Sequence, residues 1–191
     1  MGLVSNSIYD SLKDVSRLID HVIDPVVVKT TLDCNYYKTM EASRAFLQLL
    51  KAEGRLVNVA STTGQLTRYS DDVRQRFLES KTEADVTKIM EEFVTAVEAG
   101  REKEAGFPSN AYVVSKAGLI GATRALALAE KEKGSSVLIN SCCPGYVNTD
   151  MTKGRGHKTP DQGAQTPVLL ALGDLNGQTG IFWHKEKPEK W

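Results

Sequence analysis

Hydrophobic positions along the chain follow two alternating periods, one typical of amphipathic helices and the other of buried strands. Residues 8–22 and the longer stretch 28–52 carry apolar side chains at helical spacing, and Gly54 is expected to cap the second helix. Two short apolar runs, 55–61 and 137–143, have the length and composition of buried strands. This alternation predicts an α/β fold with a parallel sheet.

The middle of the chain differs in character from the segments that flank it. Residues 66–108 are rich in charged side chains, with helical periodicity in 71–79 and 83–98 and little strand propensity. Residues 110–132 then form a long Ala- and Leu-rich stretch that predicts another helix. We therefore interpret 66–108 as a helical hairpin inserted into the α/β domain.

The C-terminal part of the chain adds one helix and one strand to this pattern. A polar loop after residue 151 leads to a predicted helix over about 160–172, and the apolar run 181–185 predicts the last strand. The whole sequence thus yields about three convincing strands, which is a small sheet for so many helices.

Composition argues against several classes of function. The 24 basic residues balance the 24 acidic ones, so no net charge favours nucleic acid or an anionic membrane. No apolar run approaches the roughly 20 residues of a membrane-spanning helix, and the first residues lack the features of a signal peptide, which predicts a cytoplasmic protein. Cys34, Cys142 and Cys143 suit free thiols in a reducing compartment, and their spacing predicts neither a disulfide framework nor a metal site.

The segment Tyr112-Val113-Val114-Ser115-Lys116 is the strongest candidate for acid–base chemistry. On a helix, positions i and i+4 share one face, so the Tyr112 phenol and the Lys116 ammonium can point toward one site. A nearby cation stabilises the phenolate and lowers the pKa of a tyrosine from its reference value of about 10. Such a tyrosine can exchange a proton with a carbonyl or alcohol oxygen near neutral pH. The spacing alone also fits two unrelated helix residues, which is the commoner case.

Three further elements stand at positions where α/β enzymes place ligands. Ser61 ends the first predicted strand, where its hydroxyl could orient a substrate oxygen or simply cap a turn. Pro144-Gly145 forms a sharp turn after the second predicted strand, with the Thr149 hydroxyl close behind. Asn35 lies within the long predicted helix, where its amide could bridge backbone and water near the candidate lysine or merely face solvent.

Taken in order, these elements resemble the signature of the short-chain dehydrogenase/reductase family. The elements are Asn35 in a helix, Ser61 after a strand, Tyr112-x-x-x-Lys116, and Pro144-Gly145-x-Val147-x-Thr149. Within that family the chain is most similar to the monomeric NADPH-dependent carbonyl reductases, which likewise carry a charged helical insertion. The similarity includes the segments GRLVNVAS, FPSNAYVVSK, INSCCPGYVNTDM and KPEKW and covers roughly residues 26–191.

The resemblance implies a role for each matching residue. Tyr112 would donate the proton, and Lys116 would lower its pKa while holding the nicotinamide ribose. Ser61 would polarise the substrate carbonyl, and Asn35 would support a proton relay. The implied cofactor is NADP(H), which would be contacted by Tyr112, Lys116, Val147 and Thr149. The side chains implied around the substrate are Tyr146, Met151 and Cys143, with Trp183 nearby.

The sequence departs from the family pattern at the cofactor-binding turn. It contains no Thr-Gly-x-x-x-Gly-x-Gly segment, whose backbone amides hold the pyrophosphate, nor the strands around it. We therefore expect an incomplete Rossmann-like, doubly wound parallel sheet of about three strands. It would form a single truncated domain, 1–191, with a divergent segment 1–25 and the insertion 66–108. NADP(H) binding would be weakened or lost, and the strand edge left exposed would favour a homodimer.

Three hypotheses of function follow. The leading one is an NADP(H)-linked oxidoreductase acting on a small-molecule carbonyl or alcohol. The second keeps Tyr112 and Lys116 as an acid–base pair for isomerisation, dehydration or cyclisation without hydride transfer. The third is a non-catalytic interaction protein, or an incomplete gene product, that pairs through its strand edge. Nucleotide binding separates the first from the others, and loss of function in a Tyr112→Phe variant separates the second from the third.

Overall fold

The computed structural model of the protein describes residues 23–191, so the helix predicted over 8–22 lies outside the described residues. The helices and strands in chain order are α2 (Pro25–Leu32), a π-helical segment (Asp33–Lys38), α3 (Thr39–Leu47), β1 (Arg55–Val59), 3-10 turns (Thr62–Gly64 and Leu66–Arg68), α4 (Asp71–Glu79), α5 (Glu83–Glu98), α6 (Ala111–Glu132), β2 (Leu138–Cys143), a 3-10 turn (Asp150–Thr152), α7 (Pro160–Leu172), β3 (Phe182–His184) and β4 (Lys187–Pro188). Of the helices in this part of the chain, none has the length and hydropathy needed to cross a membrane. The cytoplasmic location stays a prediction.

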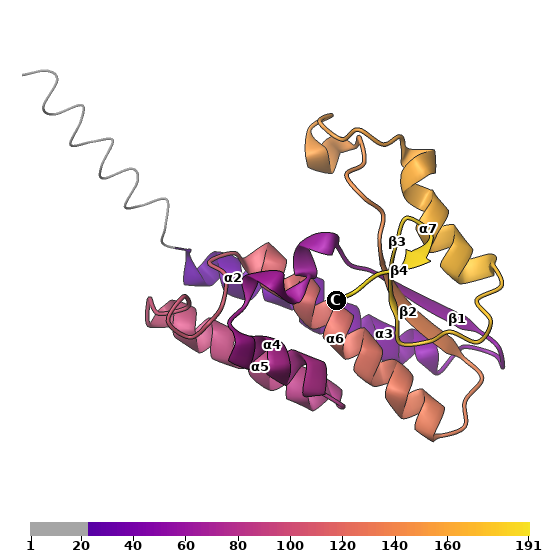
Figure 1. Cartoon of the computed structure of the whole chain (residues 1–191), viewed down its shortest axis with the longest axis horizontal. Helices are drawn as coiled ribbons and strands as arrows, with labels where there is room; N and C mark the ends of the chain where they lie inside the picture. The colour runs from indigo at the N-terminus through magenta and orange to yellow at the C-terminus, as the bar shows by residue number, and fades with distance from the viewer. Residues whose placement is uncertain (1–22) are drawn as a thin grey trace, which may run out of the picture.

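Four strands form one sheet in the order β1-β2-β3-β4 (Figure 1). β1 pairs with β2 in parallel, with Leu56 opposite Ile139, and β2 pairs in parallel with β3, with Cys142 opposite Trp183. The two-residue β4 runs antiparallel to β3 and is too short to leave a periodic signal in the sequence. The expected α/β fold with a small parallel sheet is confirmed, and β4 is an addition to it.

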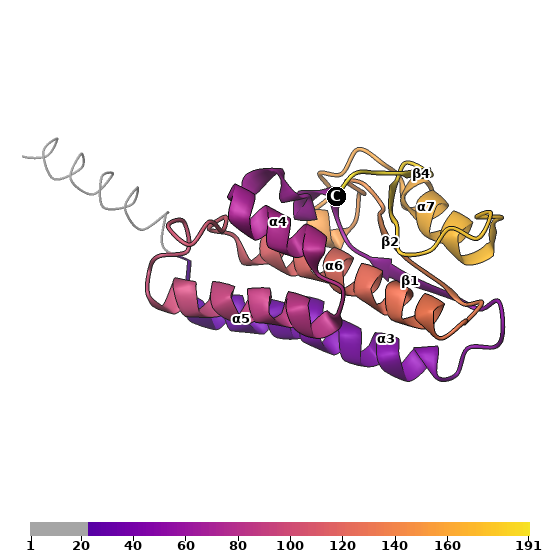
Figure 2. The same cartoon turned by 60° about the horizontal axis from the view of Figure 1, so that its bottom comes forward.

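Helices cover both faces of this sheet. α3 and α6 pack on one face, whereas α7 packs on the other against β1 and β2 (Figure 2). α5 packs along α6, and α4 packs against α5, so these two helices form a pair outside the sheet layers. Their bounds coincide with the two stretches of helical periodicity in the charged segment, and the side chains of Ser70 and Thr82 cap their first turns.

The sheet separates two groups of buried side chains. Leu56 and Ile139 are buried on the α3 and α6 face, whereas Cys142, Leu170 and Trp183 are buried on the α7 face. This division follows from the alternation of side chains along a strand, which sends neighbouring residues to opposite faces.

The first described helix differs from its predicted bounds of 28–52. Asp24 caps its first turn with the side chain, and Pro25 occupies that turn, where its missing N–H costs nothing. The helix therefore begins at Pro25 and, after the π-helical segment, ends at Leu47. Gly54 does not cap it but lies in the turn that precedes β1.

β1 is an edge strand within residues 23–191. Phe46 and Leu49, which are 62% and 77% exposed, line a hollow of about 440 Å³ along this edge together with Leu56. On the other face, Leu172 at the end of α7 is 83% exposed. An edge strand flanked by exposed apolar side chains favours pairing with a further chain.

Candidate active site

A cleft opens at the carboxyl ends of β1 and β2, the position at which α/β sheets bind ligands. Its volume is about 960 Å³. Nine of the residues that the sequence singled out as site candidates line it: Asn35, Ser61, Tyr112, Lys116, Cys143, Tyr146, Val147, Thr149 and Met151. A smaller hollow of about 650 Å³ along α5 includes none of them. The cleft is therefore the candidate active site.

The first turn of α6 positions the tyrosine and the lysine. Asn110 caps this helix by accepting a hydrogen bond of 3.0 Å from the Val113 amide, so α6 begins just before Tyr112. Tyr112 is 43% exposed toward the cleft. One turn later, the Lys116 Nζ atom lies 5.7 Å from the centre of the Tyr112 ring and donates a hydrogen bond of 2.9 Å to the Val59 carbonyl oxygen. The end of β1 thus anchors the ammonium beside the phenol.

Burial changes the electrostatics of the lysine. Loss of solvent lowers the pKa of Lys116 below its ordinary value, and interaction with the Cys143, Cys34 and Cys142 thiol groups opposes this change. The ammonium is therefore partly stripped of water where it faces the cleft. In such surroundings its attraction for a phenolate or another anion is stronger than in bulk solvent.

Ser61 lies just beyond β1 and begins the 3-10 turn Thr62–Gly64. Its Oγ atom accepts hydrogen bonds from the Thr63 amide, at 3.2 Å, and from the Thr63 hydroxyl, at 3.1 Å. A hydroxyl accepts two hydrogen bonds and donates one, so these contacts leave the Ser61 proton free to donate. Ser61 therefore caps a turn and can still donate a hydrogen bond to a ligand in the cleft.

Gly64 lets this turn contact α6 closely. A Cβ atom at Gly64 would lie 2.7 Å from the backbone of Lys116 and of Ala117, closer than side chains approach backbone atoms. The Trp191 indole N–H also donates to the Gly64 carbonyl oxygen at 3.1 Å. The serine turn and the tyrosine helix are thus held at a fixed separation by backbone contact and by the C-terminal residue.

Asn35 lies in the π-helical segment, a form that occurs often at functional sites. Its Nδ2 atom donates to the Ser115 Oγ atom at 3.1 Å, and that hydroxyl donates to the Tyr112 carbonyl oxygen at 2.8 Å. The amide therefore binds a side chain of α6. Asn35 connects the long helix to the turn that carries Tyr112.

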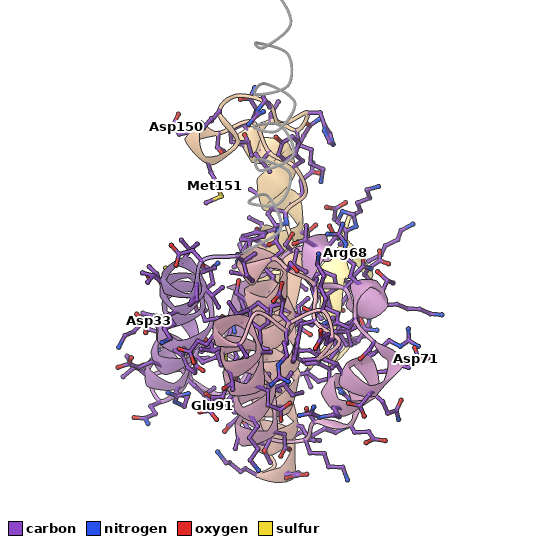
Figure 3. All side chains as sticks on the ribbon, turned by 90° about the vertical axis from the view of Figure 1, so that its left-hand side faces the viewer. Asp33, Arg68, Asp71, Glu91, Asp150 and Met151 are labelled. Atoms are coloured by element: carbon purple, nitrogen blue, oxygen red, sulfur yellow. The ribbon has the colours of Figure 1, made fainter. Side chains whose placement is uncertain are left out.

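The turn after β2 forms the opposite wall. Gly145 has a φ of +88°, and its amide donates to the Cys143 sulfur at 3.3 Å. Cys143 lines the cleft but is only 3% exposed, so little of its side chain is accessible there. Tyr146 packs against the His157 ring, with centroids 5.8 Å apart. Met151 is 89% exposed on a loop that stands apart from the helices carrying Asp33 and Glu91 (Figure 3).

Trp183 does not lie near the cleft, which corrects the expectation from the sequence. It is buried on the α7 face of the sheet with Cys142 and Leu170. Because side chains alternate along β3, the next residue, His184, faces the cleft in its place.

Several residues that line the cleft were not predicted from the sequence. These residues are Thr62, Thr63, Arg155, His157, Lys158, His184 and Lys185. The polar loop after residue 151 directly follows the Pro144-Gly145 turn in the sequence, and this proximity is the signal that could have placed it at the cleft. In the structure, backbone hydrogen bonds hold the loop against that turn.

Comparison with known proteins finds relatives that are carbonyl reductases. A family model described as short chain dehydrogenase matches residues 93–160, which include Tyr112 and Lys116. Carbonyl reductase (NADPH) 1 of Homo sapiens is 36% identical over 193 residues, which cover 95% of this chain and 70% of the human one. Carbonyl reductase (NADPH) 3 of Rattus norvegicus is 39% identical over 161 residues, which cover 82% of this chain and 58% of the rat one.

The fold is similar to that of a solved reductase. The structure of salutaridine reductase from Papaver somniferum superposes with a TM-score of 0.75 and 23% identity, covering 94% of this chain and 67% of that one. At this identity the likeness bears on the fold alone. The identity to the human and rat relatives, the share of each chain that the matches cover and the order of the cleft residues along the sequence support one conclusion. The chain belongs to the short-chain dehydrogenase/reductase family of oxidoreductases and is of the carbonyl reductase type.

Proposed function

We propose that the chain interconverts a small-molecule carbonyl compound and its alcohol with NADPH, and that Tyr112 transfers the proton. The observation that carries this proposal is that the Tyr112 phenol, the Lys116 ammonium and the Ser61 hydroxyl all face one cleft. The names of the human and rat relatives support NADPH as the cofactor and a carbonyl as the substrate.

Each residue has a distinct task in this proposal. Ser61 donates its free proton to the substrate oxygen and polarises the carbonyl. Tyr112 then gives its proton to that oxygen as negative charge develops there. Lys116 stabilises the remaining phenolate, because its partly desolvated ammonium lies beside the ring. Tyr146, Met151 and Cys143 would surround the rest of the substrate.

Asn35 would act on this chemistry from the neighbouring helix. Its Nδ2 atom fixes the Ser115 hydroxyl and, through it, the first turn of α6. The amide oxygen remains to accept a hydrogen bond from a water near Lys116, as a proton relay requires. We propose this relay as the route by which the Tyr112 proton is replaced.

The cleft fits the nicotinamide end of NADPH. Lys116 uses one of its three protons on the Val59 carbonyl, so two remain for the hydroxyls of a ribose. Val147 and Thr149, on the opposite wall, would contact the carboxamide and phosphate side. When bound, NADPH supplies the hydride.

A nucleotide titration tests this proposal. Purified protein is titrated with NADPH and separately with NADH while nucleotide fluorescence is followed. We expect saturable binding that is tighter for NADPH. Absence of saturation into the millimolar range would contradict hydride transfer by this chain.

We also propose that the chain forms a homodimer through the edge of β1. Antiparallel pairing of two β1 strands about a two-fold axis would bring each edge against its own copy, which is the self-complementary contact of a symmetric dimer. The Phe46 and Leu49 side chains of the two copies would then cover one another.

Sedimentation velocity tests the dimer. We expect the wild-type chain to sediment as a dimer and the Leu49→Glu variant as a monomer with unchanged far-UV circular dichroism. Leu78→Glu, on exposed apolar surface of α4, should remain dimeric. A wild-type chain that sediments as a monomer at all concentrations would contradict the proposal.

A further inference from the structure

The lining of the cleft carries positive charge without a compensating negative charge. Its cationic side chains are Lys116, Arg155, Lys158 and Lys185, and no aspartate or glutamate of residues 23–191 lines it. None of the four takes part in an ion pair within the described part of the chain. Unpaired cations around a cleft attract anionic ligands and raise their local concentration.

Two of the four cations have partners in the protein, and the other two are available to a ligand. The Lys116 ammonium donates to the Val59 carbonyl, and the Lys158 Nζ atom donates to the Pro144 carbonyl at 3.2 Å. The side chains of Arg155 and Lys185 are exposed and donate to no group among residues 23–191. These two come from separate segments, the loop before α7 and the turn between β3 and β4.

The loop that carries Arg155 is held against the cleft. The His157 and Lys158 amides both donate to the Tyr146 carbonyl at 3.1 Å, and the Asn148 amide donates back to the Lys158 carbonyl at 2.8 Å. Gly156 packs so closely that a Cβ atom would lie 2.0 Å from the Val147 carbonyl carbon. The guanidinium is therefore attached to backbone that is fixed on both sides of it.

Carboxylates that are near in sequence do not neutralise the cations of the cleft lining. Asp150, Asp161 and Glu186 are exposed but line no part of the cleft. Glu186 accepts a hydrogen bond of 2.8 Å from the Thr166 hydroxyl on α7. The Glu189 carboxylate lies 3.7 Å from the His184 ring and does not line the cleft.

We propose that Arg155 and Lys185 bind an anionic group, such as a carboxylate, on the substrate, so that the cleft selects acidic carbonyl compounds. The inference rests on the carbonyl reduction proposed above and names its substrate class. A guanidinium offers parallel N–H donors that match the two oxygens of a carboxylate, and Lys185 adds a second charge. The anionic group lies away from the reacting carbonyl, which Ser61 and Tyr112 hold.

A pair of ketones that differ in charge tests the proposal. 4-Acetylbenzoate carries a carboxylate, and its methyl ester is neutral. We expect the kcat/KM of the acid to exceed that of the ester by about tenfold at low ionic strength, and this ratio to fall as salt screens the charges. In the Arg155→Gln/Lys185→Gln variant the ratio should fall about tenfold. Arg68→Gln/Lys103→Gln, which removes the same charge outside the cleft, should keep the wild-type ratio.

A binding measurement separates this inference from the proposed function. Saturation-transfer NMR with 4-acetylbenzoate, without nucleotide, should show binding to the wild-type chain and loss of it in the Arg155→Gln/Lys185→Gln variant. That result supports charge recognition even where neither ketone is reduced. Equal binding of the acid to both proteins, or equal kcat/KM for acid and ester, would overturn the inference. The inference would also be overturned if the Arg155→Gln/Lys185→Gln variant bound NADPH more weakly but 4-acetylbenzoate as well as the wild type, because the two cations would then bind the nucleotide phosphates.

Discussion

Replacing Tyr112 with phenylalanine is expected to lower the kcat/KM for carbonyl reduction by at least about a hundredfold, because the variant cannot donate the proton. The fold should persist, since the side chain is 43% exposed at the cleft and the ring is retained. Initial rates with NADPH and 4-acetylbenzoate methyl ester, together with a thermal unfolding curve, measure both effects.

Tyr146→Phe is the matched control for this variant. Tyr146 has similar exposure, 45%, lines the same cleft and also loses only a phenolic hydroxyl. We expect a far smaller change in kcat, because this hydroxyl has no part in proton transfer. Equal losses of kcat/KM in Tyr112→Phe and Tyr146→Phe would contradict the assignment of Tyr112 as the proton donor.

Replacing Lys116 with methionine is expected to separate activity from stability. The kcat/KM should fall at least about tenfold, because no cation remains to stabilise the phenolate. The free energy of unfolding at pH 7, measured with urea, should stay the same or rise. The reason is that burial lowers the pKa of Lys116 in the folded chain, so its charged form opposes folding.

The lowered pKa of Lys116 also determines how the free energy of unfolding changes with pH. A lysine whose pKa is lower in the folded state than in the unfolded state reduces the free energy of unfolding at every pH below its folded-state pKa. This loss of stability disappears as the pH rises from the folded-state pKa to the ordinary lysine value of 10.5. Any stability advantage of Lys116→Met should therefore shrink as the pH rises toward that value. An advantage that grows over the same range would contradict the stated effect of burial on Lys116.

The sequence predicted the bounds of four helices closely. α4, α5, α6 and α7 agree with their predicted ranges within about one residue, because a side-chain cap fixes the first turn of each. The start of α2 was harder to place, since Pro25 can interrupt a helix or begin one, and only the capping contact from Asp24 decides. β4 depends on pairing with β3 and has no local signal of its own.

The positions of the candidate site residues were predictable, but several of their contacts were not. Order along the chain was enough to find Tyr112 and Ser61, because parallel strands bring their carboxyl ends to one edge of the sheet. The hydrogen bond from Asn35 to Ser115 joins residues far apart in sequence and depends on a π-helical segment, which composition does not reveal. The placement of Arg155 at the cleft depends likewise on how a polar loop folds back through its backbone.

Isotope transfer from the cofactor tests the central claim most directly. The chain is incubated with 4-acetylbenzoate and NADPH that carries deuterium at both hydrogen positions of nicotinamide C4, and the alcohol is analysed by mass spectrometry. The account predicts one deuterium atom per product molecule, bonded to the carbon that was the carbonyl, and no such product with Tyr112→Phe. Alcohol without deuterium, or no alcohol from a chain saturated with NADPH, would contradict it.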